Sequence, residues 1–332
     1  MNSMERMTRR LKGEPVDRVP NFDIMMNFAA HYIKKPLRAY YLDYRVLVDA
    51  NMAMLENFDL DIVQAISDPY RETHDLGGEI IFEPDHNPLC VNPLLAEYAD
   101  LEKIKFVAPA DGPRMRDRLQ ALRAFRDKVG GEVPIMGWVE GAFAQGVDVR
   151  GINELMVDVS LEPAWVTELL EKLVEVEIAF AREQIKAGAD IIGLGDAAAS
   201  MINRAMYQKF ALPYEQRIFA AVRELGALSR LHICGRTTHL LDLMAQSGAD
   251  IIDVDWMVPF DRAAEVFRDR VALCGNFDPI VVMLQGTPDD VRRATRDCID
   301  VGGPRMFSAG GCEIPDGTPH ENLYAQNEVL AS

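Results

Sequence analysis

The sequence predicts an α/β fold, a single (β/α)8 TIM barrel over residues 1–332 with an N-terminal helical extension and a small β-hairpin excursion. Short, nearly continuous apolar runs alternate with amphipathic segments, as expected for buried parallel strands between covering helices. Two units repeat, because helices ending at Gly188 and at Gly248 both run straight into Ala-Asp-Ile-Ile. With 332 residues, 48% of them hydrophobic, the chain is long enough for the core of such a barrel.

The predicted elements follow in order along the chain. The first 18 residues, which include "MERMTRRL", are predicted to form the helical extension. Residues 74–94, "HDLGGEIIFEPDHNPLCVNPL", combine Gly and Pro with alternating polar and apolar positions and predict the hairpin. Amphipathic patterns predict helices over 164–188, 213–226 and 237–248, and no linker of low complexity divides the chain. The apolar runs predict the barrel strands at 19–26, 60–67, 134–140, 190–196, 228–234, 250–256, 271–277 and 305–311.

Bulk composition narrows the classes of partner. The formal net charge of −17 repels phosphate backbones and anionic lipids, so we expect neither nucleic acid nor a membrane as a partner. The N-terminus has no apolar stretch of signal-peptide length, and no apolar run is long enough to span a bilayer, so we expect a cytoplasmic protein. The odd number of cysteines in a long chain predicts reduced thiols, either buried or bound to metal: Cys90, Cys234, Cys274, Cys298 and Cys312.

Polar residues at the ends of the predicted strands form a first group of candidate site residues. The active sites of (β/α)8 barrels lie at the carboxyl ends of the strands, where polar residues stand out against the apolar runs. This criterion selects Asp196, His232, Cys234, Asp253, Asp255, Asn276, Asp278 and Cys312.

Alternation along the strands selects a metal site from this group. In "LSRLHIC" the second leucine and the isoleucine share the apolar face, so His232 and Cys234 point into the barrel. In "DIIDVDW" the same rule turns Asp253 and Asp255 inward. Cys312 follows the last strand in "RMFSAGGC", where two glycines let the loop bend over the barrel mouth. Since zinc prefers imidazole and thiolate ligands, His232, Cys234 and Cys312 are predicted to bind zinc.

Other interpretations of these residues stay open. A His-x-Cys pair at a strand end can simply be buried, since free cysteine is among the most buried residue types. His86 and Cys90 could form a second site in the hairpin, and Asp196 could only cap the following helix. The remaining cysteines and histidines considered are predicted to lie in the core, against the barrel or at a helix surface: Cys274, Cys298, His239 and His320.

Several motifs carry a resemblance to a known family. They are "DRVP", "GWVEGAFAQGVDVRG", "GDAAASMI", "LHICG", "DVDW", "CGNFDP" and "GGCEIPDGTPHENL", and they extend over nearly the whole chain. The chain resembles the uroporphyrinogen decarboxylase superfamily, and within it the zinc-dependent, corrinoid-linked methyltransferases such as the methylcobalamin:coenzyme M methyltransferases. The resemblance implies a (β/α)8 barrel, in agreement with the predicted strands.

The resemblance also implies a set of roles. The His-x-Cys and later Cys that bind zinc in the methyltransferase branch match His232, Cys234 and Cys312. A thiol substrate or an acidic side chain takes the fourth zinc position there, and Asp255 is the candidate for the acid, ahead of Glu313 and Asp253. We further predict Asp196 as a catalytic residue beside Asp255, and contacts to the corrinoid from Asn276 and Asp278.

The predicted activity is transfer of a methyl group between a corrinoid on a partner protein and a small thiol or small methylated substrate. Zinc lowers the pKa of a bound thiol, so that the thiolate can attack the methyl group on Co(III) and leave Co(I). Apolar residues near the first strand, Phe22, Met25, Met26 and Phe28, either pack in the core or line the barrel mouth.

Three further hypotheses belong to different classes of function. Porphyrinogen decarboxylation is disfavoured, because decarboxylases of the superfamily carry Met-Arg-Gln-Ala-Gly-Arg where this chain reads "IMMNFAAHYIKK", without an arginine to hold substrate carboxylates. The same segment does not support the decarboxylase aspartate either, although Asp23 is nearby. A folate could replace the corrinoid, as in cobalamin-independent methionine synthase. The barrel could also bind a corrinoid protein or a tetrapyrrole without turnover.

Overall fold

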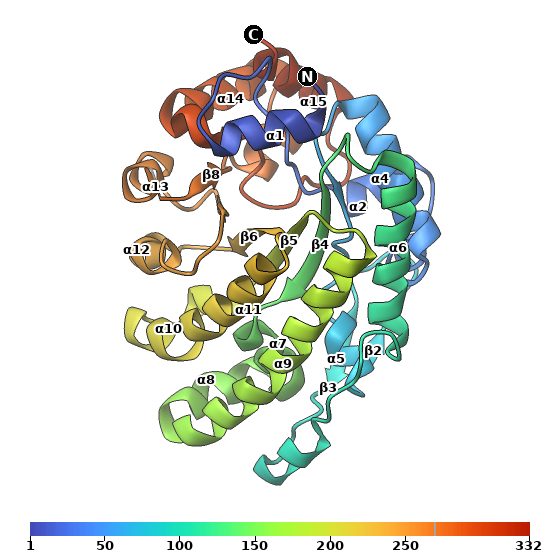
Figure 1. Cartoon of the computed structure of the whole chain (residues 1–332), viewed down its shortest axis with the longest axis vertical. Coiled ribbons are helices and arrows are strands. Elements are labelled where there is room, and N and C mark those ends of the chain that lie inside the picture. The colour runs from blue at the N-terminus through green and yellow to red at the C-terminus, as the bar shows by residue number, and fades with distance from the viewer. Residues whose placement is uncertain (269) are drawn as a thin grey trace.

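A parallel sheet curled into a barrel and enclosed by helices forms the body of the protein (Figure 1). The structure, a computed structural model, describes residues 1–268 and 270–332. Neighbouring strands pair in the order β1-β4-β5-β6-β7-β8-β9, all in parallel register. The predicted α/β barrel is therefore confirmed. The strands are β1 (Val63–Gln64), β4 (Ile135–Glu140), β5 (Ile191–Gly195), β6 (Leu228–Ile233), β7 (Ile251–Val254), β8 (Ala272–Cys274) and β9 (Met306–Phe307).

The segment predicted as the first strand closes the barrel without forming a regular strand. Asn21 makes a parallel bridge to Ser308, and the N–H of Phe22 donates to the Ser308 carbonyl over 2.8 Å. On its other side, the N–H of Asp61 donates to the Asn21 carbonyl over 2.9 Å. Pro20 has no N–H to donate, which limits how far a ladder can extend through this segment. The segment 19–26 thus occupies the eighth strand position of the barrel, with a single parallel bridge in place of a regular ladder.

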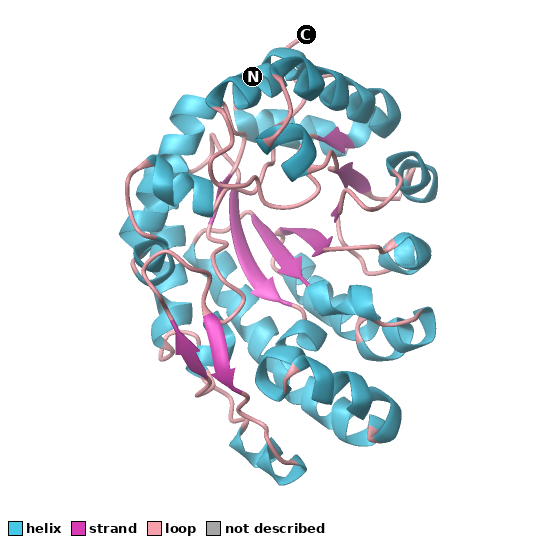
Figure 2. Cartoon of the chain, turned by 180° about the vertical axis from the view of Figure 1, so that it is seen from behind, coloured by secondary structure: helices cyan, strands magenta, loops and turns pink. Residues whose placement is uncertain are grey.

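Helices cover the outside of the sheet (Figure 2). The longest, α9, has Pro163 at its first turn and ends at Gly188 with φ 119°, the N- and C-terminal signals visible in the sequence. Among the described residues, no helix is both long and apolar enough to cross a membrane. The α-helices are α1 (Ser3–Leu11), α2 (Asn27–Tyr32), α3 (Leu37–Leu42), α4 (Tyr44–Phe58), α5 (Arg71–Asp75), α6 (Pro113–Val129), α7 (Ala142–Arg150), α8 (Ile152–Leu161), α9 (Pro163–Ala187), α10 (Arg204–Phe210), α11 (Leu212–Glu224), α12 (Leu241–Met244), α13 (Phe260–Phe267), α14 (Pro288–Gly302) and α15 (His320–Leu330). Short 3-10 or π turns are η1 (Tyr98–Lys103), η2 (Ala197–Met201), η3 (Thr238–Leu240), η4 (Pro279–Leu284) and η5 (Gly303–Arg305).

The N-terminal extension and the hairpin both lie where the sequence predicts them. A capping box between Asn2 and Glu5 starts α1, and Met7 of this helix packs into the apolar interior of the barrel. Arg10 donates from Nε to the carbonyl of Met306, at the start of β9, over 2.8 Å. Helix α1 therefore covers the end of the barrel where the strands begin. The hairpin pairs β2 (Glu79–Ile81) antiparallel to β3 (Leu89–Asn92).

The two faces of the strands separate as the alternation predicts. On β6 and β7 the outward positions, such as Leu231 and Ile252, belong to the large cluster packed against the helices. The inward positions include Arg230, which is fully buried and forms an ion pair with Asp253 inside the barrel. Because strand alternation sends every second residue inward, the polar residues at the ends of these strands converge on one space.

Candidate metal centre

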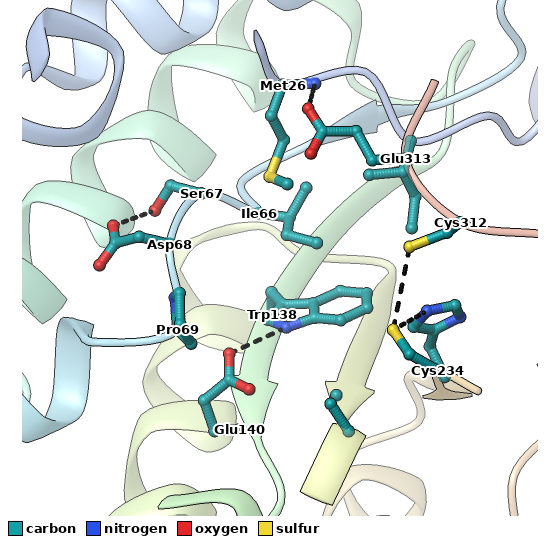
Figure 3. Close-up of a pocket in the computed structure, with 14 residues that line it drawn as sticks. Met26, Ile66, Ser67, Asp68, Pro69, Trp138, Glu140, Cys234, Cys312 and Glu313 are labelled. Atoms are coloured by element: carbon teal, nitrogen blue, oxygen red, sulfur yellow. Dashed lines mark hydrogen bonds between the residues drawn. The ribbon is translucent and has the colours of Figure 1, made fainter. Parts of the chain in front are cut away.

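Three potential metal ligands meet at the carboxyl ends of the strands. His232 Nε2 lies 3.0 Å from Cys234 Sγ, and Cys234 Sγ lies 3.8 Å from Cys312 Sγ (Figure 3). One ligand atom from each residue falls within 4.8 Å of the others. Within residues 1–268 and 270–332, this is the one group of three or more His, Cys, Asp or Glu side chains with such spacing. The structure thus brings together the three residues predicted from the sequence.

Local backbone geometry brings the two halves of the cluster together. Gly235, with φ 91°, turns the chain away directly after β6, and its N–H donates to Asp255 Oδ2 over 2.8 Å. On the other side, the N–H of Gly310 donates to Asp23 Oδ1 over 2.8 Å. A Cβ on Gly311 would collide with the backbone nitrogen of Trp256. Gly311 is therefore needed for close approach rather than for flexibility, and this contact fixes the loop that carries Cys312.

A buried chain of charged groups orients the imidazole of His232. Its Nδ1 lies 3.3 Å from Asp253 Oδ2, and the same oxygen accepts a hydrogen bond from Arg230. Burial acts to raise the pKa of Asp253, but the charges of Arg230 and His232 outweigh it and hold this pKa below its usual value. Against the effect of burial, Cys234 and Asp253 raise the pKa of His232 well above its usual value. An ionised Asp253 keeps a proton on Nδ1 and leaves Nε2 directed at the two sulfur atoms, where a metal ion would replace its proton.

The two thiols are electrostatically unequal. The hydrogen bond from Cys234 lowers the pKa of Cys312 to about 4, against the effect of burial. The same bond, together with burial, raises the pKa of Cys234 well above its usual value. One proton is thus held between two sulfur atoms beside an imidazole. A thiophilic cation bound here would displace that proton, since thiolates are the metal-binding form.

A cavity of about 170 Å³ opens beside the three ligands, and most of its wall is apolar. Its carboxyl groups come from Asp68, Glu140 and Glu313, and no arginine or lysine is among the described residues that line it. The remaining lining residues are Ile24, Met26, Ile66, Ser67, Pro69, Trp138, Gly195 and Ala197, with His232, Cys234 and Cys312 at the metal cluster.

The three carboxyl groups differ in what compensates their charge. Asp68 is paired with Arg114 over 2.5 Å, and this arginine helps to hold its pKa low against burial. Within the described part of the chain, Glu313 accepts hydrogen bonds from backbone N–H groups alone, those of Met26 over 3.2 Å and Asn27 over 2.7 Å. Burial raises the pKa of Glu313 to about 7. Burial likewise raises the pKa of Glu140 to about 8.

Other residues predicted for this site hold the backbone around it. Both carboxylate oxygens of Asp255 accept N–H groups, from Gly235 and Met257, each over 2.8 Å. Asn276 donates to the carbonyls of Asp255 and Val258, and Asp278 Oδ1 caps η4 by accepting from two N–H groups. In this arrangement both Asp255 oxygens are turned to backbone N–H groups, and Asp255 is not among the side chains that converge on the candidate metal site. Asn276 and Asp278 shape the loop after β8.

Asp196 does not face the cavity, contrary to the prediction. Alternation along β5 puts Ile192, Leu194 and Asp196 on the outer face, and the Asp196 side chain lies among the helices. Its Oδ1 accepts the N–H of Ala144 over 2.9 Å, and the carboxyl group faces Glu215. The rule that correctly placed His232 would have excluded Asp196 had it been applied to this strand.

The buried Asp196–Glu215 pair predicts a pH-dependent stability. Burial raises the pKa of Glu215 to about 7 from 4.5. Its proton therefore stabilises the fold below about pH 4.5, and this contribution is lost as the pH rises through about 7. Glu215→Gln keeps the size and shape of the side chain but removes its ionisable group. Between pH 5 and 8, urea unfolding should show wild type losing about 2 kcal/mol more stability than this variant. Equal losses would contradict the assignment.

Sequence reasoning missed two inward-facing residues of the cavity wall. Trp138 and Glu140 alternate with outward Val139 on β4, so strand alternation would have found both in "PIMGWVE". Glu140 stands at the end of β4, but neither residue has a cysteine or histidine near it in the sequence, so a metal-ligand pattern does not select them.

The other cysteines and histidines considered in the sequence lie apart from His232, Cys234 and Cys312, and packing or hydrogen bonding accounts for their positions. Cys274 and Cys298 are buried, as predicted, and His239 Nε2 contacts the Ile202 carbonyl over 3.2 Å. His320 begins α15 with its ring against those of Phe28, Tyr32 and Phe58. In the hairpin, Cys90 Sγ contacts backbone carbonyls, while His86 Nε2 lies 3.9 Å from Glu83.

Comparison with known proteins adds a family. The model of the family described as uroporphyrinogen decarboxylase (URO-D) matches residues 2–330. The chain is 30% identical to the methylcobamide:CoM methyltransferase MtbA of Methanosarcina acetivorans, covering 98% of this chain and 96% of that one. It is also 30% identical to the uroporphyrinogen decarboxylase of Trichormus variabilis, covering 96% and 93%. A solved methyltransferase from Methanosarcina mazei superposes with a TM-score of 0.90 at 24% identity, covering 99% and 98%. Identity alone therefore does not choose between the two activities.

Proposed function

Because this chain belongs to the uroporphyrinogen decarboxylase family, we propose that it is a zinc-dependent methyltransferase of that family. It would move a methyl group between a corrinoid carried by a partner protein and a small thiol, or another small methyl donor or acceptor. The observation that carries the proposal is the cluster of His232, Cys234 and Cys312 beside a small apolar cavity. The methylcobamide:CoM methyltransferase named above supports it.

The donor set fits zinc in chemistry and in spacing. Two thiolates at about 2.3 Å from a tetrahedral ion would lie about 3.8 Å apart. The sulfur atoms of Cys234 and Cys312 are 3.8 Å apart. The imidazole nitrogen of His232 is 3.0 Å from Cys234 Sγ, closer than the ~3.5 Å expected around the ion, so the two sulfur atoms fit the spacing better than the imidazole does. Asp253 supplies the carboxylate partner that zinc-binding histidines usually have.

The chemistry needs few other groups from the protein. Zinc, when bound, lowers the pKa of a coordinated thiol and leaves one ligand position for it. The substrate sulfur forms a bond to the methyl carbon, the carbon–cobalt bond breaks with its electron pair left on Co(I), and the thiol proton is released. The wall formed by Ile66, Met26 and Trp138 keeps water away from the attacking sulfur. Asp253 holds His232 in the tautomer that presents Nε2.

The cavity gives a physical reason to disfavour porphyrinogen decarboxylation. A tetrapyrrole with many carboxylates needs cationic partners, and the described residues lining this cavity include no arginine or lysine. A volume of about 170 Å³ is also below the roughly 300–1,000 Å³ of sites for drug-sized ligands. Both observations favour a small substrate.

The test is methyl transfer from methylcobalamin to a small thiol, followed by the absorbance change on loss of the cobalt-bound methyl group. We expect turnover that depends on stoichiometric zinc. Replacing methylcobalamin by a methylated folate should give no transfer. Full zinc loading without transfer to any thiol would contradict the proposal, and so would decarboxylation of a porphyrinogen by the metal-free enzyme.

A further inference from the structure

One end of the cavity is formed by a carboxyl group that no partner fully satisfies. Glu140 is the last residue of β4 and is 7% exposed, with its side chain in the cavity wall. Its Oε1 accepts from Arg71 over 2.8 Å and from the indole Nε1 of Trp138 over 3.2 Å. Among the described residues, Oε2 has no hydrogen-bond partner. A carboxyl oxygen in a cavity wall that lacks a protein partner favours a ligand that donates hydrogen bonds.

Behind Glu140, the buried carboxyl groups outnumber the arginine that contacts them. Arg71 is fully buried and contacts Glu140 and Glu72, the latter over 3.5 Å. Glu177, also fully buried, interacts electrostatically with the same three residues. One guanidinium therefore faces three carboxyl groups, and burial raises the pKa of both Glu72 and Glu177. These raised pKa values show that this end of the cavity lacks positive charge, so an ammonium group bound beside Glu140 would favour its ionised form and offset its burial.

Strand register sets the distance from this carboxyl group to the metal cluster. Glu140 pairs with Gly195 across β4 and β5, and Gly195 pairs with His232 across β5 and β6. Two strand spacings put the Cα atoms of Glu140 and His232 about 10 Å apart. A Cβ on Gly195 would lie 3.3 Å from Glu140 Oε2 and 3.0 Å from the Trp138 ring. Glycine thus keeps open the space between the carboxyl group and the imidazole.

The indole of Trp138 lies between the two ends of the cavity. Figure 3 shows its ring between Glu140 and the two cysteines. The ring is 4% exposed, and its bond to Glu140 fixes its orientation. An aromatic face beside a carboxylate is a favourable place for an ammonium group, through charge and cation–π attraction.

We propose that the substrate is a small aminothiol, whose ammonium group binds at Glu140 Oε2 and Trp138 while its sulfur reaches the His232/Cys234/Cys312 cluster. This rests on the proposed function. Two thiolates cancel the charge of Zn²⁺ and the imidazole is neutral, so the metal site as a whole carries no net charge. It therefore cannot supply the positive charge that an anionic head group would need. A cavity of about 170 Å³ with Gly195 between its two ends favours a short aminothiol over a long one.

The test compares three thiols of equal length: 2-aminoethanethiol, 2-mercaptoethanol and 2-mercaptoethanesulfonate. With methylcobalamin and zinc-loaded wild type, kcat/KM should be highest for the amine and lowest for the sulfonate. A charge-assisted hydrogen bond predicts an advantage over the neutral thiol on the order of tenfold to a hundredfold. In Glu140→Gln, the kcat/KM for the amine should fall close to that for the neutral thiol. Glu168→Gln, which makes the same substitution at an exposed position of α9 away from the cavity, should keep the advantage of the amine.

A binding measurement separates this inference from the activity. Calorimetry with 2-(methylthio)ethylamine and 2-(methylthio)ethanol on the metal-free protein should show preference for the amine in wild type, and none in Glu140→Gln. Amine binding that needs Glu140, without methyl transfer, would overturn the proposed function and keep the cation subsite. Methyl transfer with equal rates for all three thiols, or fastest for the sulfonate, would overturn this inference alone. The wild-type series decides the matter even where the variant fails to fold.

Discussion

Replacing Cys312 by alanine is expected to abolish stoichiometric zinc binding and methyl transfer together. The residue supplies one of three ligand atoms, and its thiol has a pKa lowered to about 4, so it offers a thiolate at neutral pH. Loss of one thiolate from such a set should weaken zinc binding on the order of a hundredfold or more. Because a metal that binds only the folded state stabilises it, added zinc should raise the melting temperature of wild type but not of the variant.

Cys90→Ala is the matched control for this experiment. Cys90 is also a free, partly exposed cysteine, but it lies in the hairpin with its sulfur on backbone carbonyls. Its removal should leave zinc content, melting temperature and activity as in wild type. Metal analysis of the three proteins after purification with zinc decides the question. A wild type without stoichiometric zinc, or a Cys312→Ala variant that keeps its zinc, would remove the basis of the proposed function.

Asp253→Asn is expected to lower both stability and zinc affinity. Arg230 is fully buried and has Asp253 as its ion-pair partner, with further contacts to the Phe22 carbonyl and Cys274 Sγ. Removing the charge of Asp253 leaves the buried guanidinium without its ion-pair partner, at a cost of about 3–5 kcal/mol in the free energy of unfolding. It also takes the carboxylate from His232 Nδ1, and loss of such a partner typically weakens metal binding about 10–100-fold.

The control for this variant is Asp242→Asn. Asp242 also pairs with an arginine, Arg204, but both side chains are about half exposed. Breaking such a pair should cost no more than about 1 kcal/mol and leave zinc binding unchanged. Urea unfolding and competitive zinc titration of both variants measure the two effects. Equal stability losses in the two variants would contradict a buried ion pair, and an unchanged zinc affinity in Asp253→Asn would contradict its role behind His232.

Local sequence patterns were sufficient to place most of the barrel. Each predicted strand from 134–140 to 305–311 contains an observed strand, and the αβ joints at Gly188 and Gly248 take positive φ values, as expected for helix ends. The segment 19–26 was the exception. An apolar run does not reveal how many backbone partners it will find, and here only Asn21 forms a bridge.

Alternation also located part of the site. It put His232, Cys234 and Asp253 on the inner face, where the structure has them. It would have found Glu140 on β4 and excluded Asp196 on β5, because the rule needs only the strand and its neighbours. Both positions can therefore be assigned from the local sequence alone.

The sequence by itself determined the order of the elements, the inner and outer faces of the strands and the three residues of the candidate metal site. These follow from periodicity, glycine positions and residue chemistry, all of which are local. Only the tertiary structure decided which polar groups already have partners. Asp255, Asn276 and Asp278 are held by backbone groups of neighbouring loops, while Glu140 shares one arginine with Glu72 and Glu177. Hydrogen bonds and buried charges depend on distances between segments far apart in the chain, and no local pattern records those distances.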